Sequence, residues 1–181
     1  MATLPIEMVE AGDIWTSAYV GVGANLKAPS DQVDEAITQL REIDTVRVFA
    51  TSAKYRTAPV GPNDQPDYCN AVVALMTTLG ASGLLAALQS IEQAMGRVRD
   101  GDRWGPRVID LDLLHVPGVA MQDDALTLPH PRILERAFVL IPWADVAPKL
   151  VLHDGRTVAW HAASIDSTGV SDWLVATDEN T

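Results

Sequence analysis

Hydrophobic residues recur along the chain with two different periods, and these periods predict strands and helices in a defined order. Alternating or continuous apolar runs rich in β-branched residues are typical of strands. Such runs predict strands at about residues 17–26, 45–56, 68–79 and 108–116. Apolar residues spaced three and four positions apart are typical of amphipathic helices, and they predict helices at about residues 30–43 and 82–95.

The order strand, helix, strand, strand, helix, strand indicates the fold class. It is the split βαβ pattern of a ferredoxin-like α+β sandwich. We therefore expect a mainly antiparallel four-stranded sheet with its helices on one face, which would leave the opposite face and its loops for substrates. A chain of 181 residues predicts a single domain over residues 1–181. Its core is expected at about residues 17–163, with loosely attached termini up to about residue 15 and from about residue 164.

Composition limits the partners and the location that we expect. The formal net charge of −11 disfavours binding to nucleic acid or to an anionic membrane surface. The chain contains no apolar run long enough to span a bilayer, and its first fifteen residues do not resemble a signal peptide. Its single cysteine, Cys69, cannot form an internal disulfide. These features together predict a cytoplasmic protein.

The stretch GRVRDGDRWGPRVIDLDLLHV, residues 96–116, carries the clearest candidate chemistry. Against the acidic background of the chain it contains four closely spaced arginines, Arg97, Arg99, Arg103 and Arg107. Guanidinium groups stay charged and bind phosphate oxygens with two parallel hydrogen bonds. The cluster therefore predicts a polyphosphate site.

Two aspartates follow the arginines inside a predicted strand. Because residues i and i+2 of a strand share a face, Asp110 and Asp112 should point together while Ile109, Leu111 and Leu113 point into the core. Carboxylates about 7 Å apart along a strand, beside bound phosphates, are ligands that suit Mg²⁺. The alternative is an arginine-rich surface turn leading into a strand with two solvent-facing aspartates.

A second candidate site lies in the irregular, proline-rich segment 57–68 and the strand that follows it. A loop of this length inside a compact domain is more often functional than not. Tyr68 and Asn70 could contact a flat heterocycle, because an aromatic ring stacks on it and an amide offers both donors and acceptors. The alternative is that Tyr68 belongs to the core and Asn70 caps a turn.

Several motifs together resemble one enzyme family over roughly residues 17–155. They are GRVR, RWGPR and IDLD, preceded by GVGANL and YRTAPVGPNDQPDYCN and followed by LTLPHPRILERAF. In this order and spacing they resemble the 6-hydroxymethyl-7,8-dihydropterin pyrophosphokinases of folate synthesis. The resemblance implies transfer of a diphosphoryl group from ATP to the hydroxymethyl oxygen of the pterin, with release of AMP.

The resemblance also implies a role for individual residues. The catalytic residues would be Arg97, Arg107, Asp110 and Asp112, and the two aspartates would bind two Mg²⁺ ions together with ATP. The implied ATP contacts are Gln89, Glu92, Arg99, Arg103, Arg107, Leu113, His130 and Arg136. The implied pterin contacts are Thr57, Ala58, Val60, Tyr68, Asn70, Trp104 and Phe138. Arg132 is a further positive charge to which the resemblance gives no role.

Two other functions fit some of the same features. A metal-dependent nucleotidyltransferase also uses paired aspartates, but it would release pyrophosphate instead of AMP. A non-catalytic ligand-binding or RNA-binding ferredoxin-like module would not need both carboxylates, and the acidic balance disfavours RNA. From the resemblance we expect ATP and 6-hydroxymethyl-7,8-dihydropterin as the small-molecule partners. We also expect the chain to be a monomer.

Overall fold

The computed structural model describes residues 14–59, 65–97 and 106–173. The helices are α1 (Pro29–Arg41), α2 (Ala81–Ala94), α3 (Ala137–Val146) and α4 (Val158–Ser164), with a short 3-10 helix η1 (Ile133–Glu135). The strands are β1 (Thr16–Ala24), β2 (Val46–Thr51), β3 (Tyr55–Thr57), β4 (Tyr68–Thr77), β5 (Asp110–His115), β6 (Met121–Gln122), β7 (Thr127–Leu128) and β8 (Val170–Asp172).

The main sheet is antiparallel and is built around β1 and β4, which pair along the whole length of β1. β5 lies on the outer side of β1, while β2 and β3 pair with successive parts of β4. If β2 and β3 are counted as one interrupted strand, this is the predicted four-stranded sheet. The arrangement brings the end of β1 and the starts of β4 and β5 to the same edge of the molecule.

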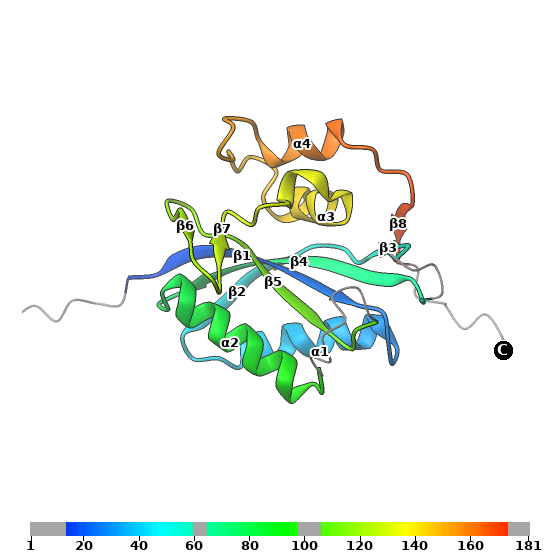
Figure 1. Ribbon diagram of the computed structural model, residues 1–181, viewed down its shortest axis with the longest axis horizontal. Coiled ribbons are helices and arrows are strands. Elements are labelled where there is room, and N and C mark those ends of the chain that lie inside the picture. Colours follow the sequence, from blue (N-terminus) through cyan, green and yellow to red (C-terminus); the bar gives the residue numbers. More distant parts are fainter. Residues whose placement is uncertain (1–13, 60–64, 98–105, 174–181) are drawn as a thin grey trace, which may run out of the picture.

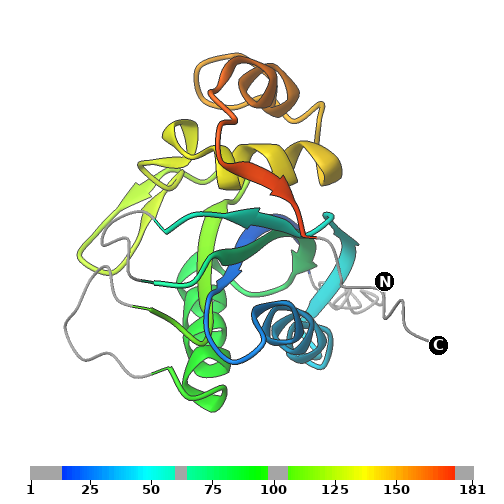
Figure 2. The ribbon, with the colours of Figure 1, turned by 90° about the vertical axis from the view of Figure 1, so that its right-hand side faces the viewer.

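The sheet lies between two helical layers (Figures 1 and 2). On one face α1 and α2 pack against the strands through a core that includes Val33, Leu40, Leu84 and Leu88. On the other face α3 and α4 enclose a second core, centred on the fully buried Trp143. Both cores depend on the removal of large apolar side chains from water.

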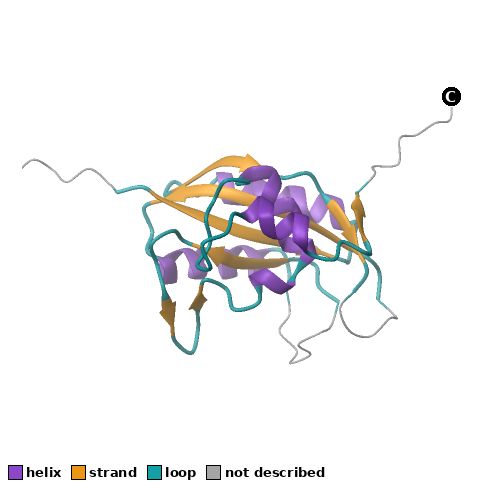
Figure 3. Ribbon diagram, turned by 90° about the horizontal axis from the view of Figure 1, so that it is seen from above, coloured by secondary structure: helices purple, strands orange, loops and turns teal. Residues whose placement is uncertain are grey.

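The prediction that helices cover only one face of the sheet was therefore wrong. Alternate residues of β4 explain why, because Ala71 and Val73 belong to the first core while Val72 and Ala74 belong to the second. A strand that is apolar on both faces needs a packing layer on each of them. Figure 3 looks onto the sheet from the side of α3 and α4 and shows strands extending beyond these helices, so the second layer covers only part of that face.

The predicted strand at 45–56 is interrupted. The pairing of β2 with β4 shifts between Val48 and Ala50, and β2 ends at Thr51 before β3 begins at Tyr55. At the break the hydroxyl of Ser52 accepts a hydrogen bond from the backbone N–H of Val72 at 2.9 Å. A side chain thus replaces a backbone partner there, which periodicity alone does not reveal.

Part of the C-terminal segment that we expected to be loosely attached is a strand of the sheet. β8 pairs antiparallel with β3, so that Thr57 lies opposite Val170. The guanidinium carbon of Arg56 lies 4.5 Å from the ring centroid of Trp173, whose backbone N–H donates to the carbonyl of Lys54 at 2.8 Å. The prediction was therefore wrong for residues 170–173. Over the described ranges, no helix has the length and apolar character needed to cross a membrane.

Candidate active site

A cavity of about 280 Å³ opens where β1 ends and where β4 and β5 begin. The segment from His130 to Val139 closes its other side. Most of the predicted contacts within the described ranges line this cavity, namely Thr57, Ala58, Tyr68, Asn70, Arg107, Asp110, Asp112, His130, Arg136 and Phe138. The candidate polyphosphate site and the candidate pterin site are therefore one continuous pocket.

Strand β5 presents both aspartates to this cavity. Asp110 and Asp112 line it, whereas the side chains of Leu111 and Leu113 lie in the first core with exposures of 4% and 3%. The prediction of one carboxylate face and one apolar face was therefore correct. Leu113 contributes its side chain to the core, and its role as an ATP contact stays a prediction.

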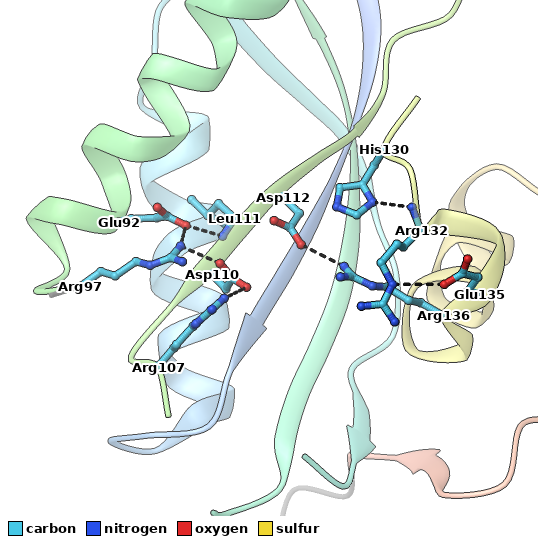
Figure 4. A network of polar contacts seen from close by, with 10 residues as sticks. All are labelled: Glu92, Arg97, Arg107, Asp110, Leu111, Asp112, His130, Arg132, Glu135 and Arg136. Carbon is cyan, nitrogen blue, oxygen red and sulfur yellow. Dashed lines mark hydrogen bonds and ion pairs between the residues drawn. The ribbon is translucent and has the colours of Figure 1, made fainter. Parts of the chain in front are cut away.

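Arginines are paired with both carboxylates (Figure 4). Arg97 donates to Oδ1 of Asp110 at 2.6 Å and Arg107 donates to Oδ2 at 2.5 Å. On the other side of the pair, Arg136 donates to Oδ2 of Asp112 at 3.4 Å. Repulsion between the two carboxylates is thus offset by guanidinium groups, and two of these groups, Arg107 and Arg136, line the cavity where they could meet an incoming phosphate.

Glu92, one of the implied ATP contacts, is buried on α2. It is 2% exposed, and its Oε1 accepts a hydrogen bond from the backbone N–H of Leu111 at 2.8 Å. The same oxygen forms an ion pair with Arg97. Because Leu111 lies between the two aspartates, Glu92 fixes the strand that carries them and also holds one of their arginines.

The pocket changes the proton affinity of Asp112. Desolvation and then repulsion from Asp110 raise its pKa to about 6, against the opposing effect of Arg136 and Arg107. The side chain remains 39% exposed, and it is exposed to the cavity that it lines. Burial alone would lower the pKa of Arg107, but Asp110, Tyr68 and Asp112 together outweigh this effect and the pKa is raised. Arg107 therefore stays charged at any relevant pH.

His130 is held as a neutral hydrogen-bonding group. Its backbone N–H donates to the carbonyl of Leu114 at 2.9 Å, which fixes the residue over β5. Desolvation and the charges of Arg136 and Arg132 lower the pKa of His130 to about 4. Nδ1 accepts a hydrogen bond from the backbone N–H of Arg132 at 3.2 Å. In the neutral ring Nε2 then carries the proton and can donate it to an anion.

The other part of the pocket carries the residues predicted to contact a pterin. Asn70 is 7% exposed and donates through Nδ2 to the hydroxyl of Thr57 at 2.8 Å. This bond orients the amide across β3 and β4. Phe138 lines the same cavity, with the guanidinium carbon of Arg136 lying 5.6 Å from its ring centroid. Phe138 is suited to stacking on a flat ring, and Asn70 is suited to bonding the polar edge of that ring.

Two residues from the end of β1 shape the site and were missed from the sequence. Asn25 is 1% exposed, and its Oδ1 accepts from the backbone N–H of Arg107 at 2.7 Å. Its Nδ2 donates to Oε1 of Gln65 at 3.3 Å and to the carbonyl of Pro66 at 3.2 Å. A Cβ added to Gly23 would lie 3.0 Å from Oδ1 of Asn70, so this glycine makes room for the amide.

Some predicted contacts are not tested by this geometry. Four of them lie outside the described residues, namely Val60, Arg99, Arg103 and Trp104. Within the described part of the chain, Gln89 is half-buried on α2 and is not part of the cavity lining. Its role as a nucleotide contact stays a prediction.

The chain matches the family model described as 7,8-dihydro-6-hydroxymethylpterin-pyrophosphokinase (HPPK) over residues 19–148. The chain belongs to this family. It is 46% identical over 155 residues to the 2-amino-4-hydroxy-6-hydroxymethyldihydropteridine pyrophosphokinase of Methylorubrum extorquens, covering 86% of this chain and 97% of the relative. The enzyme of the same name from Pseudomonas aeruginosa is 46% identical over 138 residues, covering 76% of this chain and 85% of the relative. The resemblance inferred from the motifs is therefore confirmed.

A solved structure supports the fold of this HPPK family member. Wild-type Plasmodium falciparum HPPK-DHPS superposes with a TM-score of 0.64 at 14% identity, covering 84% of this chain. The chain spans just under half of that longer protein, 45% of its length. At this identity the similarity concerns the fold alone. It confirms the predicted α+β, ferredoxin-like class, to which α3 and α4 add a second helical layer.

Proposed function

We propose that this chain transfers the diphosphoryl group of ATP to the hydroxymethyl oxygen of 6-hydroxymethyl-7,8-dihydropterin, giving AMP and the pterin diphosphate. Membership of the pyrophosphokinase family supports the reaction and both substrates. One observation carries the proposal beyond family membership. A single cavity joins an arginine-neutralised pair of aspartates to an aromatic and amide-lined pocket.

The donor set fits a magnesium ion that arrives with a nucleotide. No group of three or more His, Cys, Asp or Glu in the described ranges is arranged to hold a metal ion by itself. Mg²⁺ commonly takes only one or two carboxylates and completes its shell with water and phosphate oxygens. Asp110 and Asp112 would hold the two Mg²⁺ ions of the proposal. When bound, these ions would neutralise charge on the phosphates that face the incoming oxygen.

The protein groups around the aspartates would act mainly by positioning and electrostatics. Arg97 and Arg107 would bind the phosphates and stabilise charge on the transferred group. Arg136 would do the same beside Asp112. His130 would donate its Nε2 proton in a hydrogen bond to a phosphate oxygen. None of these steps needs a covalent enzyme intermediate, and the main requirement is alignment of the hydroxyl with the phosphorus.

The pterin would lie between Tyr68 and Phe138 with its polar edge toward Asn70. The amide of Asn70 is oriented by Thr57, so a ring that offers both donors and acceptors would find it already in place. The two alternative functions lose their support. Neither a nucleotidyltransferase nor a non-catalytic ligand-binding or RNA-binding module agrees with the description of the family to which the chain belongs.

One assay tests the proposal directly. The chain is incubated with ATP, Mg²⁺ and the reduced pterin alcohol, and the nucleotide products are resolved by chromatography. We expect AMP to form only when the pterin is present. Release of pyrophosphate, or of ADP, would overturn the proposal.

A double variant, Asp110→Asn with Asp112→Asn, tests the metal assignment. We expect turnover to fall by several orders of magnitude while pterin binding, measured by calorimetry, largely survives. The matched control is Asp44→Asn with Asp124→Asn, which removes the same charge from exposed positions outside the cavity lining. Unchanged turnover in the first variant would show that the metal assignment is wrong. A monomeric state and a cytoplasmic location remain part of the proposal.

A further inference from the structure

Arg132 lines the cavity, although neither its sequence context nor the family resemblance gave it a role. It lies two residues after His130 and just before η1. Its backbone N–H already serves the site by donating to Nδ1 of His130 at 3.2 Å. The backbone and the side chain of Arg132 therefore belong to the same wall of the pocket.

The side chain of Arg132 is held at this wall by a residue outside the cavity lining. Its Nε donates to Oε2 of Glu135 at 3.1 Å, and the side chain of Glu135 is 64% exposed. A guanidinium carries four further N–H donors on its two Nη atoms, arranged as a planar fork. A contact through Nε therefore orients the fork and is compatible with binding of an anion.

The electrostatics of this wall favour an anion. Arg132 and Arg136 both line the cavity, and their charges contribute to the low pKa of His130. Figure 4 shows them on the side of Asp112 opposite to Arg97 and Arg107. A polyphosphate that extends past the aspartates would meet guanidinium groups on both sides.

We propose that Arg132 is a further phosphate-binding residue, which acts together with Arg136 to hold one phosphate of the bound nucleotide. This inference rests on the proposed function, because it assumes that ATP occupies the cavity. Two adjacent guanidinium groups bind a phosphate with directed hydrogen bonds as well as with charge. Arg132 would then have two roles. Its side chain would bind the phosphate, and its backbone N–H would fix the tautomer of His130.

The test is the affinity for nucleotides, measured by calorimetry in the presence of Mg²⁺. The probe is α,β-methylene-ATP, whose bond between the first two phosphorus atoms resists cleavage. We expect Arg132→Gln to weaken its binding about tenfold, the effect of losing one charge-assisted contact at a partly exposed position. Arg132→Lys should recover part of the affinity, because it restores the charge without the planar fork.

Two control variants separate phosphate binding from a structural role and from net charge. If Arg132 serves only to tie down η1 through Glu135, then Glu135→Ala, which removes the acceptor, should weaken nucleotide binding as much as Arg132→Gln does. If Arg132 binds phosphate, Glu135→Ala should weaken nucleotide binding much less than Arg132→Gln does, because the guanidinium keeps its charge and its Nη donors. Arg41→Gln removes one positive charge from the exposed end of α1, outside the cavity lining, and should change nothing.

Further measurements identify the phosphate and separate this inference from the function on which it rests. Comparing AMP, ADP and the triphosphate analogue shows at which phosphate the effect of Arg132→Gln first appears. Unaltered affinity for all three nucleotides would overturn the inference, as would a loss confined to the pterin. If the unmodified chain releases no AMP in the product assay, the proposed function itself fails, whatever Arg132→Gln does to nucleotide affinity.

Discussion

Replacement of Asn25 by alanine should weaken the binding of both substrates at once. The side chain of Asn25 connects the end of β1 to Arg107 on the phosphate side and to Gln65 and Pro66 on the pterin side. It is 1% exposed, so water does not compensate for a lost partner without rearrangement. Asn25→Ala would therefore remove the side chain that connects the segment at Arg107 to the segment at Gln65 and Pro66.

The expected cost follows from the contacts. Asn25→Ala removes three side-chain hydrogen bonds, at 2.7, 3.3 and 3.2 Å. At about 1 kcal/mol each, the free energy of unfolding should fall by about 3 kcal/mol. A domain of this kind has roughly 5–15 kcal/mol of stability, so the variant should still fold. The backbone hydrogen bond from Asn25 to the carbonyl of Arg107 remains, which keeps the end of β1 in place.

Urea denaturation would measure the stability of Asn25→Ala, and calorimetry its affinity for each substrate. Asn25→Asp divides the effect, since a carboxylate still accepts from the N–H of Arg107 but cannot donate to Gln65 or Pro66. That variant should lose pterin affinity more than nucleotide affinity. If Asn25→Ala keeps unmodified affinities and loses less than about 1 kcal/mol of stability, the proposed coupling between the loops is incorrect.

Three further predictions concern other parts of the molecule. Gly23→Ala should raise the KM for the pterin with little change in thermal stability, because the new Cβ would press on Oδ1 of Asn70 at 3.0 Å; an unchanged KM would show that the amide has room to move. The pKa of Asp112 is about 6 in the folded chain, against 3.8 for an unperturbed aspartate. Between these two pH values the folded chain keeps a proton on Asp112 that the unfolded chain has already released. The free energy of unfolding should therefore decrease as the pH rises through this interval. Denaturation curves of Asp112→Asn across the interval should lack that component, and an identical slope would contradict the assignment. Ending the chain after Ser164 removes β8 and exposes the edge of β3, so it should lower the melting temperature and the pterin affinity together, whereas equal values would mean that β8 does not support the site.

The sequence by itself determined the order of the elements and the chemistry of β5. Strand and helix periods are local properties, and they predicted the six elements of the ferredoxin-like pattern to within a few residues. The common orientation of Asp110 and Asp112 follows from the two-residue period of a strand, so it required no knowledge of the fold. The motifs around these residues were specific enough to indicate the family.

Tertiary structure decided which distant segments complete the site. Asn25 contacts Arg107 across 82 positions of the chain, and Glu92 reaches the backbone of Leu111 across 19. A polar residue just after a strand, or on a helix, gives no sign in the sequence of such a partner. Only the packing of α2 against β5 buries Glu92, a residue type that is usually solvated, and makes it a support for the strand that carries the aspartates.

The second helical layer and β8 were decided in the same way. Periodicity shows that a strand is apolar on both faces, but it does not say which later segment covers each face. The partial covering of one face by α3, with Trp143 at the centre of the second core, depends on how the chain returns across the sheet. The local pattern of apolar residues determined whether each segment is a strand or a helix. Packing between distant segments determined where each element lies, because the free energy of burial depends on partners that are far apart in the sequence.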